Sequence, residues 1–249
     1  WPEGMLEIII VSDGSVDATN EIVTRLALDD DVVLASDIEG RPRLRLITHN
    51  ENRGKPAALN AGLAEASGEF VVFTGVRQRF EPDAVRRLVS NFADPEVGAV
   101  SGEMVFMEGS ETDIRAEMGL YWNYEKWIQR TESKIHSVAG ATGAIYAARR
   151  SLITPLPEET ILDDVLITMR CVMRAMRTVF DTRAVAWDRA SLNLATARRR
   201  KLRTLLGNYQ LVRLAPSLLS PRRNPIFLQF VSHKMLRLPV PFFFILMMA

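Results

Sequence analysis

Two short stretches of the sequence combine glycine with an acidic or a basic residue in a way that suits ligand binding. In the first, IIIVSDGSVDAT (residues 8–19), an apolar run ends at Asp13 and a glycine. An apolar run without alternation is typical of a strand in a parallel sheet, and an acid at its carboxyl end stands where open α/β sheets bind ligands. In the second, NRGKPAALNAG (residues 52–62), Lys55 follows a glycine and precedes a small-residue helix whose first turn suits a phosphate group.

A pair of neighbouring acids, Asp163 and Asp164, is the best candidate on the chain for proton transfer. They lie in ETILDDVLITMR, near the start of a helix predicted over residues 161–175. A general base needs a sheltered carboxylate and a neighbour that tunes it, and an acidic pair meets both needs. The alternative is structural, because two acids at a helix start also interact favourably with the helix macrodipole.

The elements that must position these residues alternate between strands and helices. Apolar runs predict the strands and amphipathic periodicity predicts the helices, and Gly68 is placed to end the second helix. This βαβ spacing predicts an α/β fold with a parallel, doubly wound sheet. The predicted strands are residues 8–11, 44–47, 70–73, 97–106 and 145–148, with two more near Val179 and Val185, and the predicted helices are one capped by Asp17, residues 57–66, one from Pro82, and residues 112–131 and 161–175.

Charge is distributed unevenly along the chain. Residues 189–249 contain eleven Lys and Arg and no Asp or Glu, whereas the first 188 residues contain 20 basic and 30 acidic residues. This split predicts an acidic body and a basic segment that meets an anionic surface. The uncharged end, LPVPFFFILMMA, favours a membrane over a nucleic acid, and no recognition module for nucleic acid accompanies the charge.

Taken in their order, these motifs resemble those of the family 2 glycosyltransferases. The resemblance implies a GT-A type fold, with a Rossmann-like, mostly parallel sheet flanked by helices and with C-terminal amphipathic, membrane-proximal helices. It implies an inverting enzyme that transfers a sugar from a nucleotide-sugar donor, expected to be a UDP-sugar, to a polysaccharide or lipid-linked acceptor. We expect a catalytic domain at residues 1–195 that lacks the family's first strand, a basic interface segment at 196–237, and the start of a membrane helix at 238–249, with the catalytic domain on the cytoplasmic side of the cell membrane.

The resemblance assigns a role to each candidate residue. Asp13 is expected to hold the nucleoside, with local bonding to the amides of its own turn as the alternative. Lys55 supplies a positive charge for the uracil or the diphosphate, and Asp17 is expected to cap a helix first and bind the donor second. Asp164 is the expected base of the inverting displacement, supported by Asp163.

Two further positions depart from the family pattern. Arg200 and Arg203 lie in RKLRT, which resembles the family's (Gln/Arg)-x-x-Arg-Trp motif with Thr204 in place of tryptophan. Three residues apart, the two arginines share a helix face that suits the diphosphate and the acceptor sugar, and the alternative is a membrane-facing basic patch. Gly75 stands where the family commonly carries the Asp of its metal motif, so Mg²⁺ or Mn²⁺ is expected from the family but lacks this ligand.

The absent acid leaves two hypotheses for function. The first is an active glycosyltransferase, and the second is a pseudoenzyme that keeps the nucleotide-sugar pocket without catalysis. Two other patterns concern burial. The aromatic residues at positions 121, 122, 124 and 127 lie on different helix faces, so an aromatic left at a groove is available to stack on a sugar. Cys171, among apolar neighbours, is expected to be a buried thiol.

Overall fold

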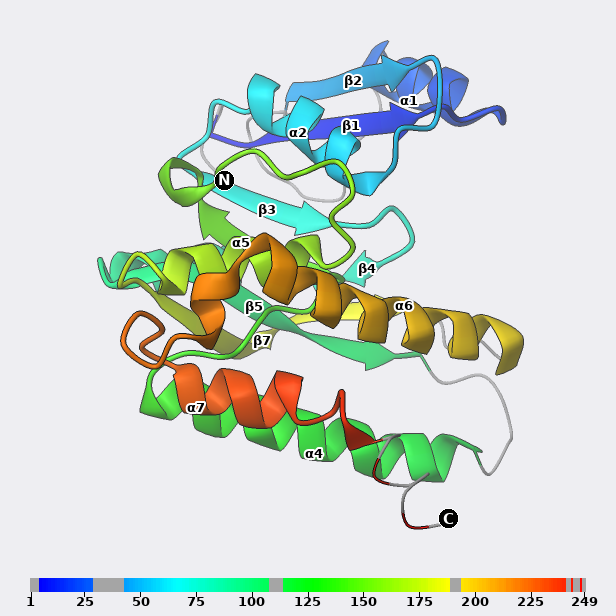
Figure 1. Ribbon diagram of the computed structural model, residues 1–249. Coiled ribbons are helices and arrows are strands. Elements are labelled where there is room, and N and C mark those ends of the chain that lie inside the picture. Colours follow the sequence, from blue (N-terminus) through cyan, green and yellow to red (C-terminus); the bar gives the residue numbers. More distant parts are fainter. Residues whose placement is uncertain are drawn as a thin grey trace. The chain divides into compact units, whose positions relative to one another are not determined.

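The computed structural model describes residues 5–28, 43–107, 114–188 and 194–240, together with residues 243 and 247. Its contacts divide the chain into two compact units (Figure 1). Unit 1 comprises Trp1–Val71 and Thr154–Thr160, and unit 2 comprises Val72–Ile153 and Ile161–Ala249. The boundaries expected after residues 195 and 237 separate segments by function, and they stay predictions.

Unit 1 contains two parallel strands and two helices. Strand β1 (Glu7–Asp13) pairs in parallel with β2 (Arg43–His49), so that Asp13 lies opposite His49. The helices are α1 (Thr19–Leu28) and α2 (Lys55–Glu65). Both strands were predicted, but residues 8–11 are half-buried rather than enclosed on both faces.

The helices of unit 1 differ from their predictions in detail. Helix α2 begins two residues earlier than expected, at Lys55, and it ends at Glu65, so Gly68 does not cap it. On α1, Val23 is buried, whereas Ile22 and Leu26 are 52% and 37% exposed. The predicted apolar face of α1 is therefore covered only in part.

The sheet of unit 2 has the strand order β3-β6-β5-β7-β4. Its β5 and β7 are parallel, whereas β5–β6 and β4–β7 are antiparallel. The predicted α/β class is confirmed, and the sheet is mixed because an alternation of strands and helices does not by itself set every strand's direction. The strands are β3 (Phe70–Thr74), β4 (Arg79–Phe80), β5 (Val97–Phe106), β6 (Ile145–Arg149) and β7 (Arg177–Asp188).

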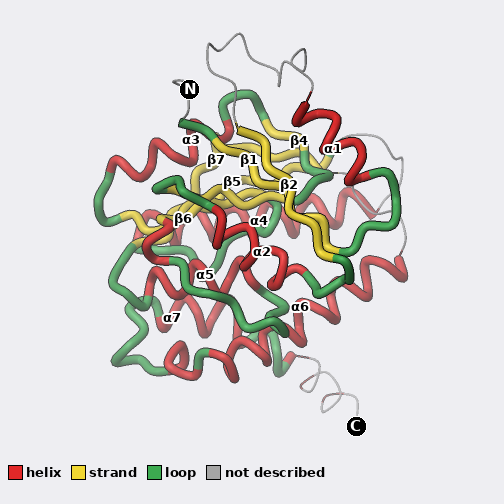
Figure 2. The backbone as a smooth tube through the Cα atoms, turned by 90° about the horizontal axis from the view of Figure 1, so that it is seen from above, coloured by secondary structure: helices red, strands yellow, loops and turns green. Residues whose placement is uncertain are grey.

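The segments near Val179 and Val185 form one strand, β7, where the sequence predicted two. The register between β5 and β7 shifts at Gly102, and a Cβ at that position would lie 2.5 Å from the Ala184 carbonyl oxygen. Because glycine has no side chain, β7 approaches closely there and continues through the irregularity. The two long strands run side by side in Figures 1 and 2.

Helices and helical turns complete unit 2. Helix α5 presents apolar residues nearly all round and is buried along most of its length, which matches its place in the core. Cys171 on this helix is buried as predicted, and burial raises the pKa of its thiol to about 12. The helical elements are α3 (Ala84–Ser90), η1 (Asn91–Ala93), α4 (Ile114–Ile135), η2 (Arg150–Leu152), α5 (Asp163–Val172), α6 (Leu194–Leu214), η3 (Pro216–Leu219), α7 (Phe227–Phe230) and the π-helical turn η4 (Val231–Met235).

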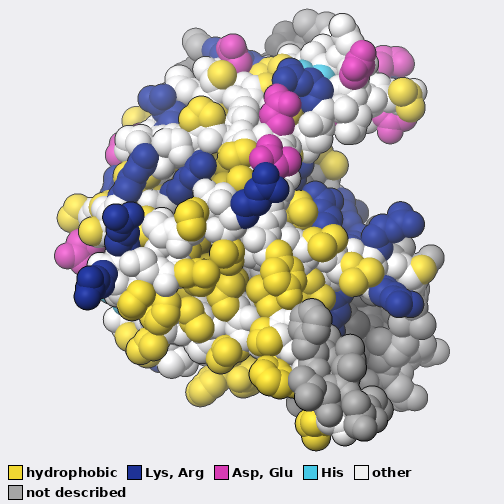
Figure 3. Space-filling view, viewed as in Figure 1, with side chains coloured by type: hydrophobic (Ala, Val, Ile, Leu, Met, Phe, Trp, Pro, Cys, Tyr) yellow, Lys and Arg dark blue, Asp and Glu magenta, His cyan; other side chains and the backbone are white. Residues whose placement is uncertain are grey.

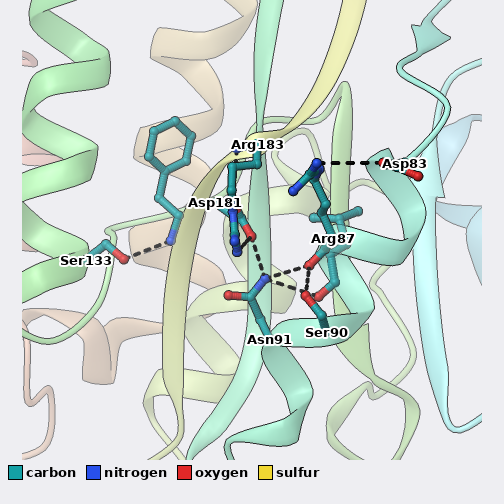
Figure 4. A network of polar contacts seen from close by, with 9 residues as sticks. Asp83, Arg87, Ser90, Asn91, Ser133, Asp181 and Arg183 are labelled. Atoms are coloured by element: carbon teal, nitrogen blue, oxygen red, sulfur yellow. Dashed lines mark hydrogen bonds and ion pairs between the residues drawn. The ribbon is translucent and has the colours of Figure 1, made fainter.

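A polar network centred on Asp181 joins α3 and η1 to strand β7 (Figure 4). Asn91 donates a hydrogen bond to Asp181 Oδ2 across 2.9 Å, and it also donates to the Arg87 carbonyl. The Arg183 guanidinium binds both carboxylate oxygens of Asp181. Burial opposes the charge on Asp181, but these hydrogen bonds outweigh it and lower the pKa of the carboxyl. Both carboxylate oxygens of the buried Asp181 thus accept hydrogen bonds.

The segments after β7 pack against the rest of unit 2. A Cβ at Gly207 of α6 would lie 2.6 Å from Leu162, and the Gln210 side chain accepts a hydrogen bond from the Ile161 backbone. Helix α6 therefore lies directly on the segment that leads into α5. Farther along, α7 and η4 run beside α4 (Figure 1).

Candidate functional site

In unit 1, the Asp13 carboxylate organises the loop that enters α2. Its Oδ1 accepts hydrogen bonds from the Arg53 amide at 3.0 Å and from His49 Nδ1 at 2.8 Å, and its Oδ2 accepts one from the Gly54 amide at 2.7 Å. The hydrogen bond from the Arg53 amide, helped by those from His49 and Gly54, lowers the pKa of Asp13 despite its partial burial.

These partners differ from the local turn amides that the sequence suggested as the alternative for Asp13. The carboxylate connects the end of β1 to the loop before α2, whose Arg53 and Gly54 lie 40 and 41 residues later in the chain. Two oxygens of an ionised carboxylate have about four acceptor positions, so these bonds are compatible with a further donor from a ligand. Contact with a nucleoside stays a prediction.

Two glycines allow the loops of unit 1 to meet. Gly14 has φ +71°, and a Cβ there would lie 2.5 Å from the Asn52 backbone nitrogen. Gly54 has φ +89° and directly precedes α2, which has Pro56 in its first turn and no acidic residue there. Both conformations favour glycine. The first turn of α2 has no acidic residue of its own, and the carboxylate at this positive end of the helix is that of Asp13, which binds the Gly54 amide.

The other predicted donor residues of unit 1 have different surroundings. Asp17 Oδ1 accepts hydrogen bonds from the Thr19 amide and hydroxyl at 3.1 and 2.5 Å, so it bonds to the start of α1 as predicted. These bonds with Thr19 lower the pKa of the exposed Asp17 carboxyl. Lys55 is exposed at the first residue of α2, next to the loop that Asp13 holds.

In unit 2, the two acids at the start of α5 have distinct environments. Asp163 is only 3% exposed, and the Tyr146 hydroxyl of β6 donates to its Oδ2 across a long 3.4 Å. Burial, together with the nearby charges of Asp163 and Asp164, raises the pKa of Tyr146 well above its usual range. The ring of Tyr146 stacks on Phe73 with centroids 4.6 Å apart. Asp163 is thus part of the core.

Asp164 is half-buried, and its Oδ1 accepts a hydrogen bond from the Val165 amide across 2.9 Å. The structure therefore distinguishes the two members of the acidic pair. The one predicted to be the supporting acid is enclosed, and the one predicted to be the base retains access to solvent. The alternative of a purely macrodipole role does not account for the burial of Asp163.

Gly75 follows β3, at the expected position of a metal ligand. A Cβ on Gly75 would lie 2.5 Å from Gln78 Oε1, a buried oxygen with no hydrogen-bond partner among the described residues. The Gln78 amide and the Arg77 guanidinium both donate to Asp188 Oδ2, at 3.1 and 2.8 Å. The loop after β3 is thus closed onto the end of β7.

This loop does not fit a divalent cation. Mg²⁺ and Mn²⁺ prefer several oxygen ligands, whereas Gly75 contributes no side chain. The neighbouring carboxylate, that of Asp188, is already paired with the Arg77 guanidinium. Within residues 5–28, 43–107, 114–188 and 194–240, no three His, Cys, Asp or Glu side chains gather into a group that suits a metal.

Arg200 and Arg203 lie on α6, and both are exposed. The same stretch exposes Arg198, Arg199 and Lys201. The predicted helix is confirmed, and anion binding and a membrane-facing patch stay predictions for the two arginines.

The predicted residues fall into two groups. Asp13, Asp17 and Lys55 belong to unit 1. The acidic pair, Gly75 and the two arginines belong to unit 2. Sequence reasoning missed two sets of polar residues. These are His49, opposite Asp13, and a cluster in unit 2 formed by Glu125, Glu132, His233, Lys234 and Arg237.

The family is shown by a match of residues 2–154 to the model of Glycosyl transferase family 2. The chain belongs to this family, which confirms the class predicted from the sequence.

Two curated relatives are similar to it. Poly-beta-1,6-N-acetyl-D-glucosamine synthase of Staphylococcus aureus (strain COL) is 24% identical over 89% of this chain and 52% of the relative. The probable glycosyltransferase YdaM of Bacillus subtilis (strain 168) is 26% identical over 85% of this chain and 50% of the relative. The chain thus spans about half the length of these relatives.

Solved structures agree with the fold. The mannosyltransferase PcManGT from Pyrobaculum calidifontis, solved with GDP-Man and Mn²⁺, has a TM-score of 0.69 and 25% identity, over 85% of this chain and 56% of that one. Residues 1–349 of S. aureus TarS have a TM-score of 0.61 and 17% identity, over 93% of this chain and 63% of that one. Both are similar across nearly all of the chain, so the predicted GT-A type fold is confirmed.

Proposed function

We propose that the chain transfers a sugar, with inversion, from a nucleotide-sugar donor to a saccharide or lipid-linked acceptor at a membrane. The observation that carries the proposal is the unequal pair at the start of α5, with Asp163 enclosed and Asp164 half-buried. In inversion, the acceptor hydroxyl attacks the anomeric carbon as its proton passes to a base and the nucleoside diphosphate leaves. Asp164 is our candidate for that base.

Unit 1 supplies the residues proposed for the donor. The Asp13 carboxylate and the loop that it holds suit a nucleoside N–H or a ribose hydroxyl. Lys55, exposed at the first residue of α2, suits the negative charge of the diphosphate. We expect UDP as the carrier. The S. aureus relative is named for an N-acetyl-glucosamine polymer, and PcManGT was solved with GDP-Man, so both nucleotides belong in a test.

The pseudoenzyme hypothesis rests on the same site and on one observation. Gly75 supplies no carboxylate, and the loop around it is closed by the contacts of Arg77 and Gln78 with Asp188. Without a metal, the charge of a leaving diphosphate has to be balanced by basic residues. A protein without that balance would bind the donor and not turn it over.

Membrane association is part of the proposal. Figure 3 shows hydrophobic side chains gathered over the C-terminal segments of unit 2. Leu202 and Leu206, one helical turn apart on α6, are 52% and 61% exposed beside a run of basic residues. Exposed leucine with flanking arginine is typical of a helix that lies on an anionic bilayer. None of the helices in the described part of the chain has the length and the hydropathy to cross one, and most of residues 241–249 lie outside that part.

The test compares donors and variants of the full chain in anionic liposomes. We would measure nucleotide release and labelled-sugar transfer from UDP-GlcNAc, UDP-glucose and GDP-mannose to oligosaccharide and lipid-linked acceptors, with and without Mn²⁺. Asp164→Asn keeps the shape of the side chain and should lower transfer about 10²-fold or more. Asp83→Asn, at an exposed acid near the start of α3, is the matched control.

Each outcome separates the hypotheses. Transfer that depends on Asp164 and not on Asp83 supports the enzyme. Donor binding without release or transfer supports the pseudoenzyme. Transfer that Asp164→Asn leaves intact removes Asp164 as the base.

A further inference from the structure

An exposed arginine stands on the loop between β3 and β4 (Figure 1). The Arg77 side chain is 55% exposed, and its Nη2 donates a hydrogen bond to Asp188 Oδ2 across 2.8 Å. Asp188 is the last residue of β7, and its side chain is only 4% exposed. The pair therefore has its acid in the protein interior and its positive end toward solvent.

The contact with Asp188 engages only part of the guanidinium. Arginine carries five N–H donors in a planar fork, and Nη2 is the nitrogen that reaches this acid. Gln78 donates to the same Asp188 oxygen across 3.1 Å and helps to fix the acid in place. In the part of the chain that the structure describes, no acid other than Asp188 pairs with Arg77. The other N–H groups of the guanidinium are therefore available to an anion that binds at this loop.

The loop lies at the edge of the sheet from which open α/β folds bind their ligands. It leaves the carboxyl end of β3 and is attached to the carboxyl end of β7. The Thr74 hydroxyl, at the end of β3, lies 3.2 Å from the Ala144 carbonyl oxygen, just before β6. Tyr146 of β6 stacks on Phe73 and donates to Asp163. Contacts of β3 and β6 thus connect this loop to the acidic pair of α5, all within unit 2.

The same loop carries a fixed positive charge in place of a metal ligand. Gly75 offers no carboxylate, and Arg77 follows it by two residues. A divalent cation at Asp188 would have to displace the guanidinium, because like charges repel at such short range. The residues at the expected metal position therefore suit an anion directly.

We propose that the Arg77 guanidinium, held by Asp188, binds the diphosphate of the donor and supplies the positive charge that a metal would otherwise give. The inference rests on the proposed function. When the bond between the anomeric carbon and the diphosphate oxygen breaks, its electron pair stays on that oxygen, while the proton of the acceptor hydroxyl passes to the base. The leaving group gains one negative charge, and the planar fork of a guanidinium matches two phosphate oxygens. Transfer by this chain then needs no divalent cation.

The alternative is a structural role, in which Arg77 only compensates the buried charge of Asp188. The two roles differ in the ligands that a substitution affects. Loss of a structural arginine would disturb the loop and weaken every nucleotide alike. Loss of a diphosphate-binding arginine would weaken UDP more than UMP, because UMP lacks the second phosphate group.

The experiment titrates UDP, GDP and the corresponding monophosphates into the full chain by calorimetry, with EDTA and again with Mn²⁺. Arg77→Met removes the cation. Arg77→Met combined with Asp188→Asn removes both charges of the pair, so it leaves no unpaired acid in the interior and keeps the net charge of the chain. Arg86→Met is the matched control, because Arg86 is an exposed arginine of unit 2 whose acid partner, Asp83, is also exposed. Circular dichroism checks folding, and the double variant gives the result where Arg77→Met alone does not fold.

With EDTA present, both Arg77 variants should bind the preferred nucleoside diphosphate about tenfold more weakly than wild type, with a smaller loss for the monophosphate. Arg86→Met should bind like wild type. Binding that needs Mn²⁺, an unchanged affinity in the folded variants, or an equal loss for both kinds of nucleotide would overturn the inference and leave the transferase in place. No binding of UDP or GDP by the wild-type chain, with or without Mn²⁺, would instead overturn the proposed function, and the role of Arg77 with it.

Discussion

Gly54 donates its backbone N–H to Asp13 Oδ2 across 2.7 Å, and this bond joins the end of β1 to the residue that directly precedes α2. Oδ1 of the same carboxylate accepts from the next amide back, that of Arg53. An acid predicted to contact a ligand is therefore also the residue that shapes the loop around Lys55. Binding and local stability should depend on it together.

Asp13→Asn should weaken both properties. The amide replaces one acceptor oxygen with a donor that faces a backbone N–H, which should lower the free energy of unfolding by about 1–3 kcal/mol. Affinity for UDP, measured by calorimetry at neutral pH, should fall as well. Glu21→Gln, on the exposed face of α1, is the control and should change neither. Unchanged UDP affinity in a folded Asp13→Asn protein would remove Asp13 from the donor site.

The lowered pKa of Asp13 also sets a direction for acid stability. A carboxyl whose pKa is lower in the folded protein stabilises it above the ordinary value near 3.8, and this contribution is lost as the pH falls through the folded value. The stability difference between wild type and Asp13→Asn should therefore narrow as the pH falls below about 4. Urea unfolding at a series of pH values measures it, and a constant difference would contradict the assignment.

His233 should give the opposite pH dependence. Burial opposes its charge, but the hydrogen bonds with Glu125 and Glu132 outweigh burial and raise its pKa above the ordinary value of 6.5. Its contribution to stability should be full below pH 6.5 and should be lost as the pH rises through the folded value. The stability difference between wild type and His233→Gln, from urea unfolding, should therefore be larger at pH 5.5 than at pH 9.

The matched control for this measurement is His136→Gln. His136 is half-buried and contacts the Ser137 hydroxyl rather than a carboxylate. Its substitution should give a difference from wild type that changes much less between the two pH values. Parallel behaviour of the two variants would argue against a charged His233 between the glutamates.

The sequence was most informative where function and local structure use the same residues. The start of α5 at the acidic pair and the helix after Lys55 follow from short-range patterns, and the structure has both. The ring stacking of Phe73 on Tyr146 and the pairing of His233 with Glu132 join residues far apart in sequence. Short-range sequence patterns do not predict such contacts.

The ion pairs of the acid-free C-terminal stretch likewise could not be predicted from its local sequence. From the sequence, no acid opposes its basic residues, so the stretch is predicted to meet a membrane surface, with donor binding as a second role for Arg200 and Arg203. In the structure, Arg237 and His233 are paired with acids of α4, more than a hundred residues earlier. The sequence of a segment shows which charges it carries, whereas the residues that pair with those charges depend on the tertiary fold.

A substitution at Gly75 tests the hypothesis that the missing carboxylate at this position weakens metal binding. An Asp there would place its Cβ against Gln78 Oε1, so Gly75→Asp alone has to displace that side chain. Gly75→Asp combined with Gln78→Ala should bind Mn²⁺ more tightly than the single variant, because the new carboxylate then has room. Calorimetric titration with Mn²⁺ in the presence of UDP measures this, with Gln78→Ala alone as control. Equal affinity in all three proteins would show that position 75 does not decide metal binding.

The last prediction concerns α6 and the bilayer. Leu202 and Leu206 are exposed one turn apart, next to arginines that each contribute about 1 kcal/mol near an anionic surface. Replacing both leucines by serine should weaken co-sedimentation with liposomes that contain anionic lipid, since less apolar surface enters the interface. The matched control replaces Ile22 and Leu26, which are also exposed and also one turn apart, on α1. Binding by the wild-type chain should need anionic lipid and weaken with salt, because the attraction is screened. Equal losses in the two double variants, or equal binding to neutral liposomes, would assign the exposed leucines of α6 no particular part in membrane association.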